Sequence, residues 1–175
     1  TVAYNGSGAQ LISSVHLGTN YVNAYWTGTQ MAFGDGDNSQ ASSLAKDFDV
    51  VAHELTHAVT DSTANLNYES DSGALNEGMS DIFAAAGSAW KDGAVSANTW
   101  LIGEACWTPG TSGDALRYMA NPTQDGYSKD YYPERAYATS CTPSSSNDYC
   151  GVHYNSGIAN LAFYLLSQGG THPRG

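Results

Sequence analysis

The chain has 175 residues, of which 17 are Asp or Glu and six are Lys or Arg, so its formal net charge at neutral pH is −11. This length is enough for one domain with a hydrophobic core. The acidic charge favours solubility and argues against nucleic acids and anionic membranes as partners.

The beginning of the chain is predicted to form β structure. Residues 1–33 carry aromatic and β-branched side chains that alternate weakly between Gly and Asn residues, which is typical of short antiparallel strands. Thr1 is not a translation start, and no signal peptide or transmembrane run is found. We therefore expect the chain to begin after processing or after a cut in a longer protein.

An apolar run from Asp49 to Thr60 contains the motif His-Glu-x-x-His. On a helix, His53 and His57 lie one turn apart on the same face, where both imidazoles can reach one cation. Glu54 then lies at the flank of that face, where its carboxylate can act as a general base towards a metal-bound water. The simpler alternative is a helix with two surface histidines.

A second helical run, from Gly73 to Ala86, contains Glu77, and residues 90–98 after it are predicted to be loop. Catalytic zinc takes three protein ligands and leaves a fourth position for water, and two His with one Glu form a recurring set. Glu77 is therefore the candidate third ligand. A purely structural zinc site is an alternative, but such sites usually fill all four positions, often with Cys, and no Cys lies near either run in sequence.

The last third of the chain is predicted to be a long loop followed by an apolar helix over residues 151–168. Cys141 and Cys150 bracket a polar segment of this loop, and we expect them to form a disulfide, which suits an oxidising compartment. The sequence does not fix the connectivity. With this pairing, Cys106 would be free, buried, or paired with another chain.

His-Glu-Leu-Thr-His at residues 53–57, followed by Asn-Glu-Gly-Met-Ser-Asp at residues 76–81, resembles the thermolysin-like neutral metallopeptidases. Further segments match this family in the same order over nearly the whole chain, namely Asn23–Trp26, Thr108–Asp114 and Gly151–Gly157. The resemblance implies a secreted zinc endopeptidase that acts on peptides or proteins. Many Gly, Ser and Asn residues with few Lys also suit an extracellular location.

The resemblance implies roles for four residues in catalysis. Glu54 would be the general base, and Tyr68 and His153 would donate hydrogen bonds to the oxyanion that forms during cleavage. Asp148, five residues before His153, would orient its imidazole and keep it protonated.

The family pattern also places two residues behind the zinc ligands. A metal-bound imidazole usually donates its other ring N–H to a carboxylate or carbonyl oxygen. The resemblance assigns this task to Asp81 and Asn76, behind His53 and His57. Asp81 is the stronger candidate because it follows Glu77 by four residues and so lies on the same helical face.

Substrate binding is expected along one strand and one pocket. The resemblance implies that Asn23 and the backbone of Ala24 belong to an edge strand that pairs with an extended substrate, and that Arg117 reaches a substrate carbonyl oxygen. An apolar pocket beside the scissile bond would favour a bulky hydrophobic residue after that bond. The expected walls of this pocket are Leu44, Val50 and Leu116.

The turn Thr-Pro-Gly-x-Ser-Gly-Asp is similar to one that binds calcium in the family. Side chains and carbonyls would supply hard oxygen ligands. These ligands would come from Thr108, Asp114, Trp107 and Thr111. A plain Pro-Gly turn is the alternative. At the family's other calcium position only Asp49 and Glu104 remain, and two carboxylates rarely hold calcium alone.

These features predict an α+β, zincin-like fold. Residues 1–60 would form an antiparallel β region that ends in the central zinc helix, and residues 61–175 would form the Glu77 helix, loops and the start of a C-terminal α-helical lobe. Family members have further segments on both sides, so we expect the chain to be a fragment of a larger catalytic domain, with those segments as candidate partners. Two functions stay open: an active endopeptidase, or a zinc-binding fragment that needs the missing segments for catalysis.

Overall fold

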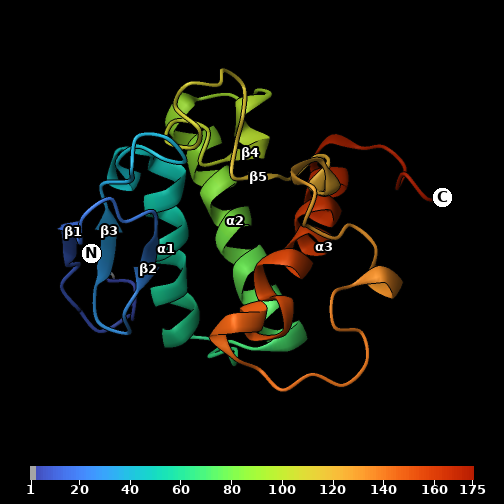
Figure 1. Ribbon diagram of the computed structural model, residues 1–175, viewed down its shortest axis with the longest axis horizontal. Helices are drawn as coiled ribbons and strands as arrows, with labels where there is room; N and C mark the ends of the chain where they lie inside the picture. Colours follow the sequence, from blue (N-terminus) through green and yellow to red (C-terminus); the bar gives the residue numbers. More distant parts are fainter. Residues whose placement is uncertain (1–2) are drawn as a thin grey trace.

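The computed structural model of the chain describes residues 3–175, so the first two residues of the predicted β region lie outside it. Its long helices are α1 (Phe48–Ser62), α2 (Ser70–Asp92) and α3 (Asp148–Gln168). Figure 1 shows a small sheet, α1, α2 and α3 side by side in chain order, which confirms the α+β class. Among the described residues, no helix has both the length and the apolar character needed to span a membrane.

The sheet contains β1 (Ser13–Leu17), β2 (Ala24–Trp26) and β3 (Met31–Gly34) in the order β1–β3–β2. β2 and β3 are antiparallel, as predicted, but β1 runs parallel to β3. The prediction of a purely antiparallel region is therefore wrong for this pair. The chain reverses direction twice between β1 and β3, and β3 lies between the other two strands. Weak alternation predicts strands, but it does not reveal which strands become neighbours.

α1 has two different faces. β3 is buried along its whole length, and an apolar cluster joins the sheet to α1. Its buried members are Met31, Phe33, Ala41, Leu44, Val50 and Cys106. His53 and His57 instead contact Glu77 on α2. One helix therefore anchors the sheet and presents polar side chains to the helical layer.

α2 is the middle helix and packs against both α1 and α3. It approaches α3 closely at Gly78, where an added Cβ would lie 2.7 Å from the Cβ of Ala159. The helix is longer than the predicted residues 73–86 and ends at Asp92, so the first residues of the predicted 90–98 loop are helical. Ala and Ser residues continue the helix, and Gly93, with a φ of 70°, supplies the left-handed residue that ends it.

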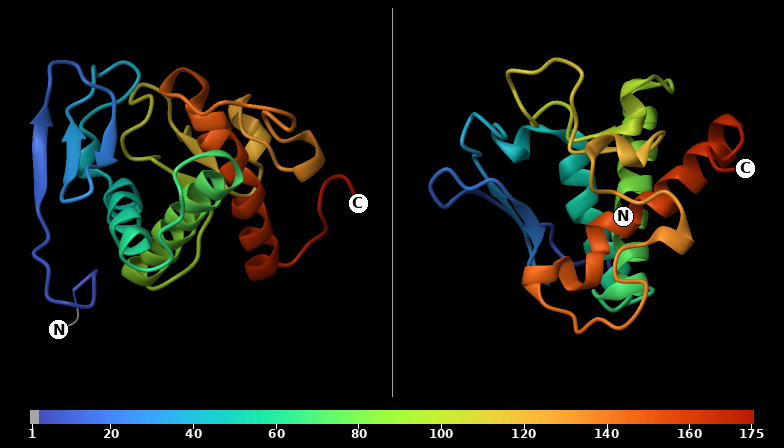
Figure 2. Two further views of the ribbon diagram at one scale, coloured as in Figure 1. Left: turned by 90° about the horizontal axis from the view of Figure 1, so that it is seen from below. Right: turned by 45° about the vertical axis from the view of Figure 1, so that its right-hand side comes forward.

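α3 begins with an irregular turn. Its residues 149–151 have left-handed backbone angles, so the regular helix starts at Val152. The predicted disulfide is confirmed: Cys141 and Cys150 are joined, with their Cα atoms 6.0 Å apart, and Cys106 is a buried free cysteine. Figure 2 shows in two further views that the sheet and α3 lie on opposite sides of the α1–α2 pair.

A short antiparallel pair, β4 (Leu101–Ile102) and β5 (Arg117–Tyr118), lies between α2 and α3 in sequence. β4 packs against α2, and β5 begins with the buried residue Arg117. This pair therefore brings a cation from a loop-rich region to the buried side of α2. The sequence analysis did not predict either strand.

Candidate metal centre and cleft

α1 and α2 bring three side chains with metal-binding atoms together. His53 Nε2 and His57 Nε2 are 3.1 Å apart, and each lies close to a carboxylate oxygen of Glu77, at 3.2 and 3.3 Å. A tetrahedral zinc ion with ligand distances of roughly 2.0–2.1 Å separates its ligands by about 3.3 Å. The three residues therefore fit a zinc ion.

The electrostatics of this cluster also favour a bound cation. Glu77 is fully buried, and its Oε2 has no hydrogen-bond partner. Burial alone would raise the pKa of Glu77, but His153 and His53 hold it well below its usual range. Burial alone would lower the pKa of His53, but Glu77 and Asp81 raise it to about 10. Zinc binding at this site therefore competes with protonation of His53.

Each histidine is held from behind by a residue of α2. His53 Nδ1 lies 2.8 Å from Asp81 Oδ1, and His57 Nδ1 lies 2.8 Å from Asn76 Oδ1. A ring N–H that donates at Nδ1 leaves the Nε2 lone pair directed at the cluster with Glu77. The structure thus brings together all five of these predicted residues.

Arg117 makes a contact that the sequence analysis did not predict. Its Nε and Nη2 donate to the two oxygens of Asp81 at 2.8 and 2.7 Å, and the guanidinium is buried. Asn160 Nδ2 donates to Asp81 Oδ2 at 2.8 Å, a contact that the sequence analysis missed. Burial alone would raise the pKa of Asp81, but Arg117 and His53 lower it. The Arg117 side chain therefore neutralises the carboxylate behind the metal centre.

A cleft of about 530 Å³ opens in front of the cluster. Its walls come from the edge strand β2, from α1 and from the start of α3. They include the predicted residues Asn23, Ala24, His53, Glu54, His57, Tyr68, Asn76, Glu77 and His153. Glu54 is buried and its Oε2 has no partner. Burial raises the pKa of Glu54, although His53 and His57 act in the opposite direction. Its carboxylate is therefore suited to accept a proton.

Tyr68 and His153 lie close to each other, and both contact Glu77. The Tyr68 hydroxyl donates to Glu77 Oε1 and lies 3.3 Å from His153 Nε2, which in turn lies 3.3 Å from the same Glu77 oxygen. Burial and Glu77 raise the pKa of Tyr68, so the phenol stays a neutral donor. Asp148 accepts from His153 through both its ring Nδ1, at 2.5 Å, and its backbone N–H, at 2.8 Å.

The three predicted pocket walls do not line this cleft. Leu44 and Val50 are buried in the apolar cluster between the sheet and α1. Leu116 lines a separate cavity of about 520 Å³, beside Trp107 and Tyr118. One shared pocket for these three residues therefore stays a prediction.

The predicted calcium turn has its two side chains in contact. Thr108 Oγ1 donates to Asp114 Oδ2 at 2.6 Å, and the Tyr118 hydroxyl donates to the other oxygen. These two hydrogen bonds lower the pKa of Asp114.

A third carboxylate lies beside Asp49 and Glu104, the two residues that remain at the second predicted calcium position. Asp47, Asp49 and Glu104 present oxygens within 4.8 Å of one another, and burial together with both neighbours raises the pKa of Asp49. The sequence analysis did not include Asp47 at this position.

Two family models match the chain. The model described as thermolysin metallopeptidase, catalytic domain, matches residues 1–61, and the one described as thermolysin metallopeptidase, alpha-helical domain, matches residues 64–175. Among solved structures, the precursor of protealysin, a metalloproteinase from Serratia proteamaculans, is 35% identical with a TM-score of 0.78, over 94% of this chain and 52% of that chain.

Curated relatives are more similar in sequence but much longer. A bacillolysin from Brevibacillus brevis is 50% identical over 170 residues, which make up 97% of this chain and 29% of the relative. A thermolysin from Alicyclobacillus acidocaldarius is 49% identical over 171 residues, with 98% and 29% covered. The chain thus spans less than a third of the length of these relatives. Since the two family models together match almost all of its residues, the chain belongs to the thermolysin metallopeptidase family.

Proposed function

We propose that the protein containing this chain is a secreted, zinc-dependent endopeptidase. The observation that carries the proposal is the meeting of His53, His57 and Glu77 at the floor of a cleft that also holds the partnerless carboxylate of Glu54. Metal ligands, a base and an open cleft are the parts that metal-assisted hydrolysis requires. The disulfide supports secretion, because such bonds persist in oxidising compartments.

The residues would share the work of cleavage. When bound, zinc supplies a Lewis acid for the scissile carbonyl and the attacking water. Glu54 takes the proton from that water and passes it to the leaving amine. Tyr68 and His153 donate hydrogen bonds to the oxyanion, and Asp148 holds the His153 imidazole. Asp81 and Asn76 keep the two ligand imidazoles in the orientation that the ion needs.

Substrate would bind along β2. This strand is at the edge of the described sheet, and Asn23 and Ala24 line the cleft, so an extended peptide can add to it as a further strand. We keep the preference for a bulky hydrophobic residue after the scissile bond as part of the proposal. Its support is the family resemblance and the position of Val50, which precedes His53 by one helical turn. Arg117 stays a candidate for contact with a substrate carbonyl, although both its observed donors bind Asp81.

The first prediction concerns Glu54. In the whole protein, Glu54→Gln should keep one zinc per molecule but lose several orders of magnitude of peptidase activity, because an amide cannot accept the proton of the attacking water. Zinc content by mass spectrometry and digestion of a peptide library would measure both. The same digest would also give the sequence specificity. Cleavage mainly before acidic residues would contradict the preference for a hydrophobic residue after the scissile bond.

Two results would change the details of this proposal. Loss of zinc together with activity in Glu54→Gln would show that Glu54 holds the metal centre together rather than acting as the base. The second candidate function is a zinc-binding but inactive fragment, which is favoured by the small share of its relatives that the chain covers. A 175-residue chain that binds zinc and cleaves nothing, beside an active whole protein, would support this candidate for the chain alone.

Calcium is a further part of the proposal. The ligands would be Thr108 and Asp114, whose side chains already touch, with the carbonyls of Trp107 and Thr111. The second prediction is that calcium raises the melting temperature of the zinc-loaded protein, and that Asp114→Asn removes the part of this shift due to the turn. Asp49→Asn is the matched variant at the Asp47–Asp49–Glu104 cluster. A melting temperature that does not respond to calcium would contradict both locations.

A further inference from the structure

A left-handed turn opens α3. Asp148, Tyr149, Cys150 and Gly151 have φ angles of 53°, 47°, 69° and 81°. Only Gly takes up such angles without steric cost, because a Cβ atom meets the backbone there. Strained residues of this kind persist where the surrounding structure over-determines them, and they collect at functional sites. The contacts around this turn show what restrains it and which residues it positions.

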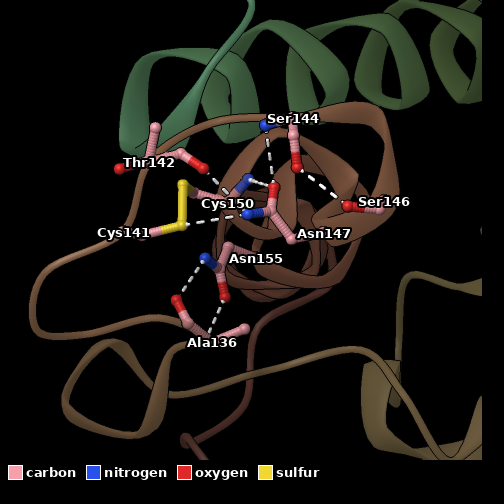
Figure 3. Close-up of a disulfide and its surroundings, with 8 residues drawn as sticks. All are labelled: Ala136, Cys141, Thr142, Ser144, Ser146, Asn147, Cys150 and Asn155. Atoms are coloured by element: carbon pink, nitrogen blue, oxygen red, sulfur yellow. Dashed lines mark hydrogen bonds between the residues drawn. A yellow bond between two sulfur atoms is a disulfide. The ribbon is translucent and has the colours of Figure 1, made fainter.

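The disulfide and one asparagine restrain the turn from the preceding loop (Figure 3). Cys150 is bonded to Cys141, and its backbone N–H donates to Asn147 Oδ1 at 3.1 Å. Asn147 also accepts from the backbone N–H of Ser144 at 3.0 Å and donates to the carbonyl of Thr142 at 2.9 Å. Cys150 is thus tied covalently and by hydrogen bonds to the same short loop.

The base of the loop is fixed to α3 itself. Asn155, one turn into the regular helix, accepts from the backbone N–H of Ala136 at 2.8 Å and donates to its carbonyl at 3.1 Å (Figure 3). Gly151 packs under this contact, since an added Cβ would lie 3.0 Å from the Cβ of Ala136. Because the loop is fixed to α3 at Ala136, the disulfide can restrain the turn at Cys150.

With its left-handed backbone angles, the turn positions residues in and beside the cleft. Asp148 is its first residue and holds both the ring and the backbone N–H of His153. Tyr149 lines the cleft, with its ring centroid 5.6 Å from that of Tyr68 in an edge-on arrangement. If Tyr149 and Cys150 relaxed to ordinary backbone angles, the position of Asp148 relative to His153 would change.

We propose that the Cys141–Cys150 disulfide is a positioning element of the catalytic site, which holds the left-handed turn so that Asp148 fixes His153 towards the metal centre. This inference rests on the proposed peptidase function. The disulfide itself touches neither substrate nor metal. It acts through the backbone of the turn. Its loss should therefore lower kcat and leave zinc binding unchanged.

The test compares two ways of removing the bond in the whole protein. Cys141→Ser with Cys150→Ser opens the bond and leaves a strained residue at position 150, so kcat should fall roughly 10- to 100-fold, as expected when an oxyanion donor is displaced. Cys141→Ser with Cys150→Gly also lacks the bond, but Gly adopts the left-handed angle freely and should restore most of kcat. Zinc content should stay at one per molecule in both variants.

Two controls separate positioning from general stability. Cys106→Ala removes the buried free cysteine, which lies outside the turn, and should leave kcat unchanged. In a His153→Ala background, the Ser–Ser pair should have little further effect on kcat, because the residue that it misplaces is gone. All assays would be run well below the melting temperatures of the variants.

The outcomes are distinct. Full kcat in the Ser–Ser variant, or a loss that Gly does not restore, would overturn the positioning role while leaving the peptidase function in place. An equal loss in the His153→Ala background would overturn it as well, since the disulfide would then act on something other than His153. If the wild-type protein itself cleaves no peptide, the proposed function is overturned, and this inference, which rests on it, is overturned with it.

Discussion

Asp81 connects the candidate metal centre to β5 and α3. Its Oδ1 accepts from His53 and Arg117, and its Oδ2 accepts from Arg117 and Asn160. A buried carboxylate with this many donors is stable as an anion, and the guanidinium balances its charge. Asp81 therefore has two tasks: it orients a ligand imidazole, and it compensates a buried cation.

The third prediction concerns these two tasks. Asp81→Asn keeps the shape of the side chain but removes its charge. Zinc affinity should fall by roughly 10- to 100-fold, the usual effect of losing the partner of a ligand histidine. The free energy of unfolding should fall by about 3–5 kcal/mol, because Arg117 is left buried without its counter-ion. Competition with a chelator and urea denaturation would measure the two effects.

Asp71 offers a matched control on the same helix. Its exposed carboxylate at the start of α2 accepts from the Tyr132 hydroxyl and lies 3.5 Å from Arg135. Asp71→Asn should leave zinc affinity unchanged and cost less than about 1 kcal/mol. Equal zinc affinities in the wild-type protein and Asp81→Asn would contradict the proposed link between Asp81 and the metal.

At the residue scale, the sequence predicted which residues share one face of the same helix. Helical spacing alone places His53, Glu54 and His57 together, and the same rule places Asp81 on the Glu77 face. Arg117 and Asn160 are 36 and 79 residues from Asp81, so their contacts depend on how β5 and α3 pack. Nothing in the local pattern carries that information. The sequence analysis also missed Asp47 as a third carboxylate beside Asp49 and Glu104.

At the scale of elements, close approach of α2 and α3 brings Glu77 and His153 together. Gly73 and Gly78 make this approach possible, since an added Cβ at Gly73 would lie 2.5 Å from Val152 Cγ1. The existence of the helices could be predicted from apolar periodicity. The turn at the start of α3 and the parallel pairing of β1 could not, because both arise from contacts between distant segments.

The fourth prediction tests this approach. Gly78→Ala should lower the free energy of unfolding by about 1–3 kcal/mol, because the new methyl group would overlap Ala159 and lie 3.3 Å from the Ser156 carbonyl. The higher helix propensity of Ala, up to about 1 kcal/mol, is too small to offset the larger part of this range. Urea denaturation of the zinc-loaded protein gives the value.

Gly87→Ala is the control in the same helix. Its added Cβ would meet only the ring of Phe48, at 3.3 Å, and that ring is partly exposed and can move. This variant should be neutral or more stable by up to about 1 kcal/mol. If Gly78→Ala were also neutral, α2 and α3 would have more room between them than the structure shows.

At the scale of the whole molecule, the helical layer leaves large apolar side chains in solvent. On α2, Phe83 and Trp90 are 56% and 85% exposed, and on α3 Leu166 is 87% exposed. Single exposed apolar residues are common, but Phe83 and Trp90 are seven residues apart and therefore share one helical face. The curated relatives are more than three times as long as their matched part. In a protein of that length, a further segment would have the opportunity to cover this face.

The fifth prediction is that a further segment of the same protein packs on this face of α2. The fluorescence of Trp90, taken as the difference between the wild-type protein and Trp90→Phe, should be red-shifted and readily quenched by acrylamide in the 175-residue chain. It should be blue-shifted and shielded in the whole protein. Trp100, which is 8% exposed, gives the control through Trp100→Phe and should be shielded in both. A Trp90 that stays accessible in the whole protein would mean that this face is open in the working molecule. On this face, α2 would then receive no support from a further segment.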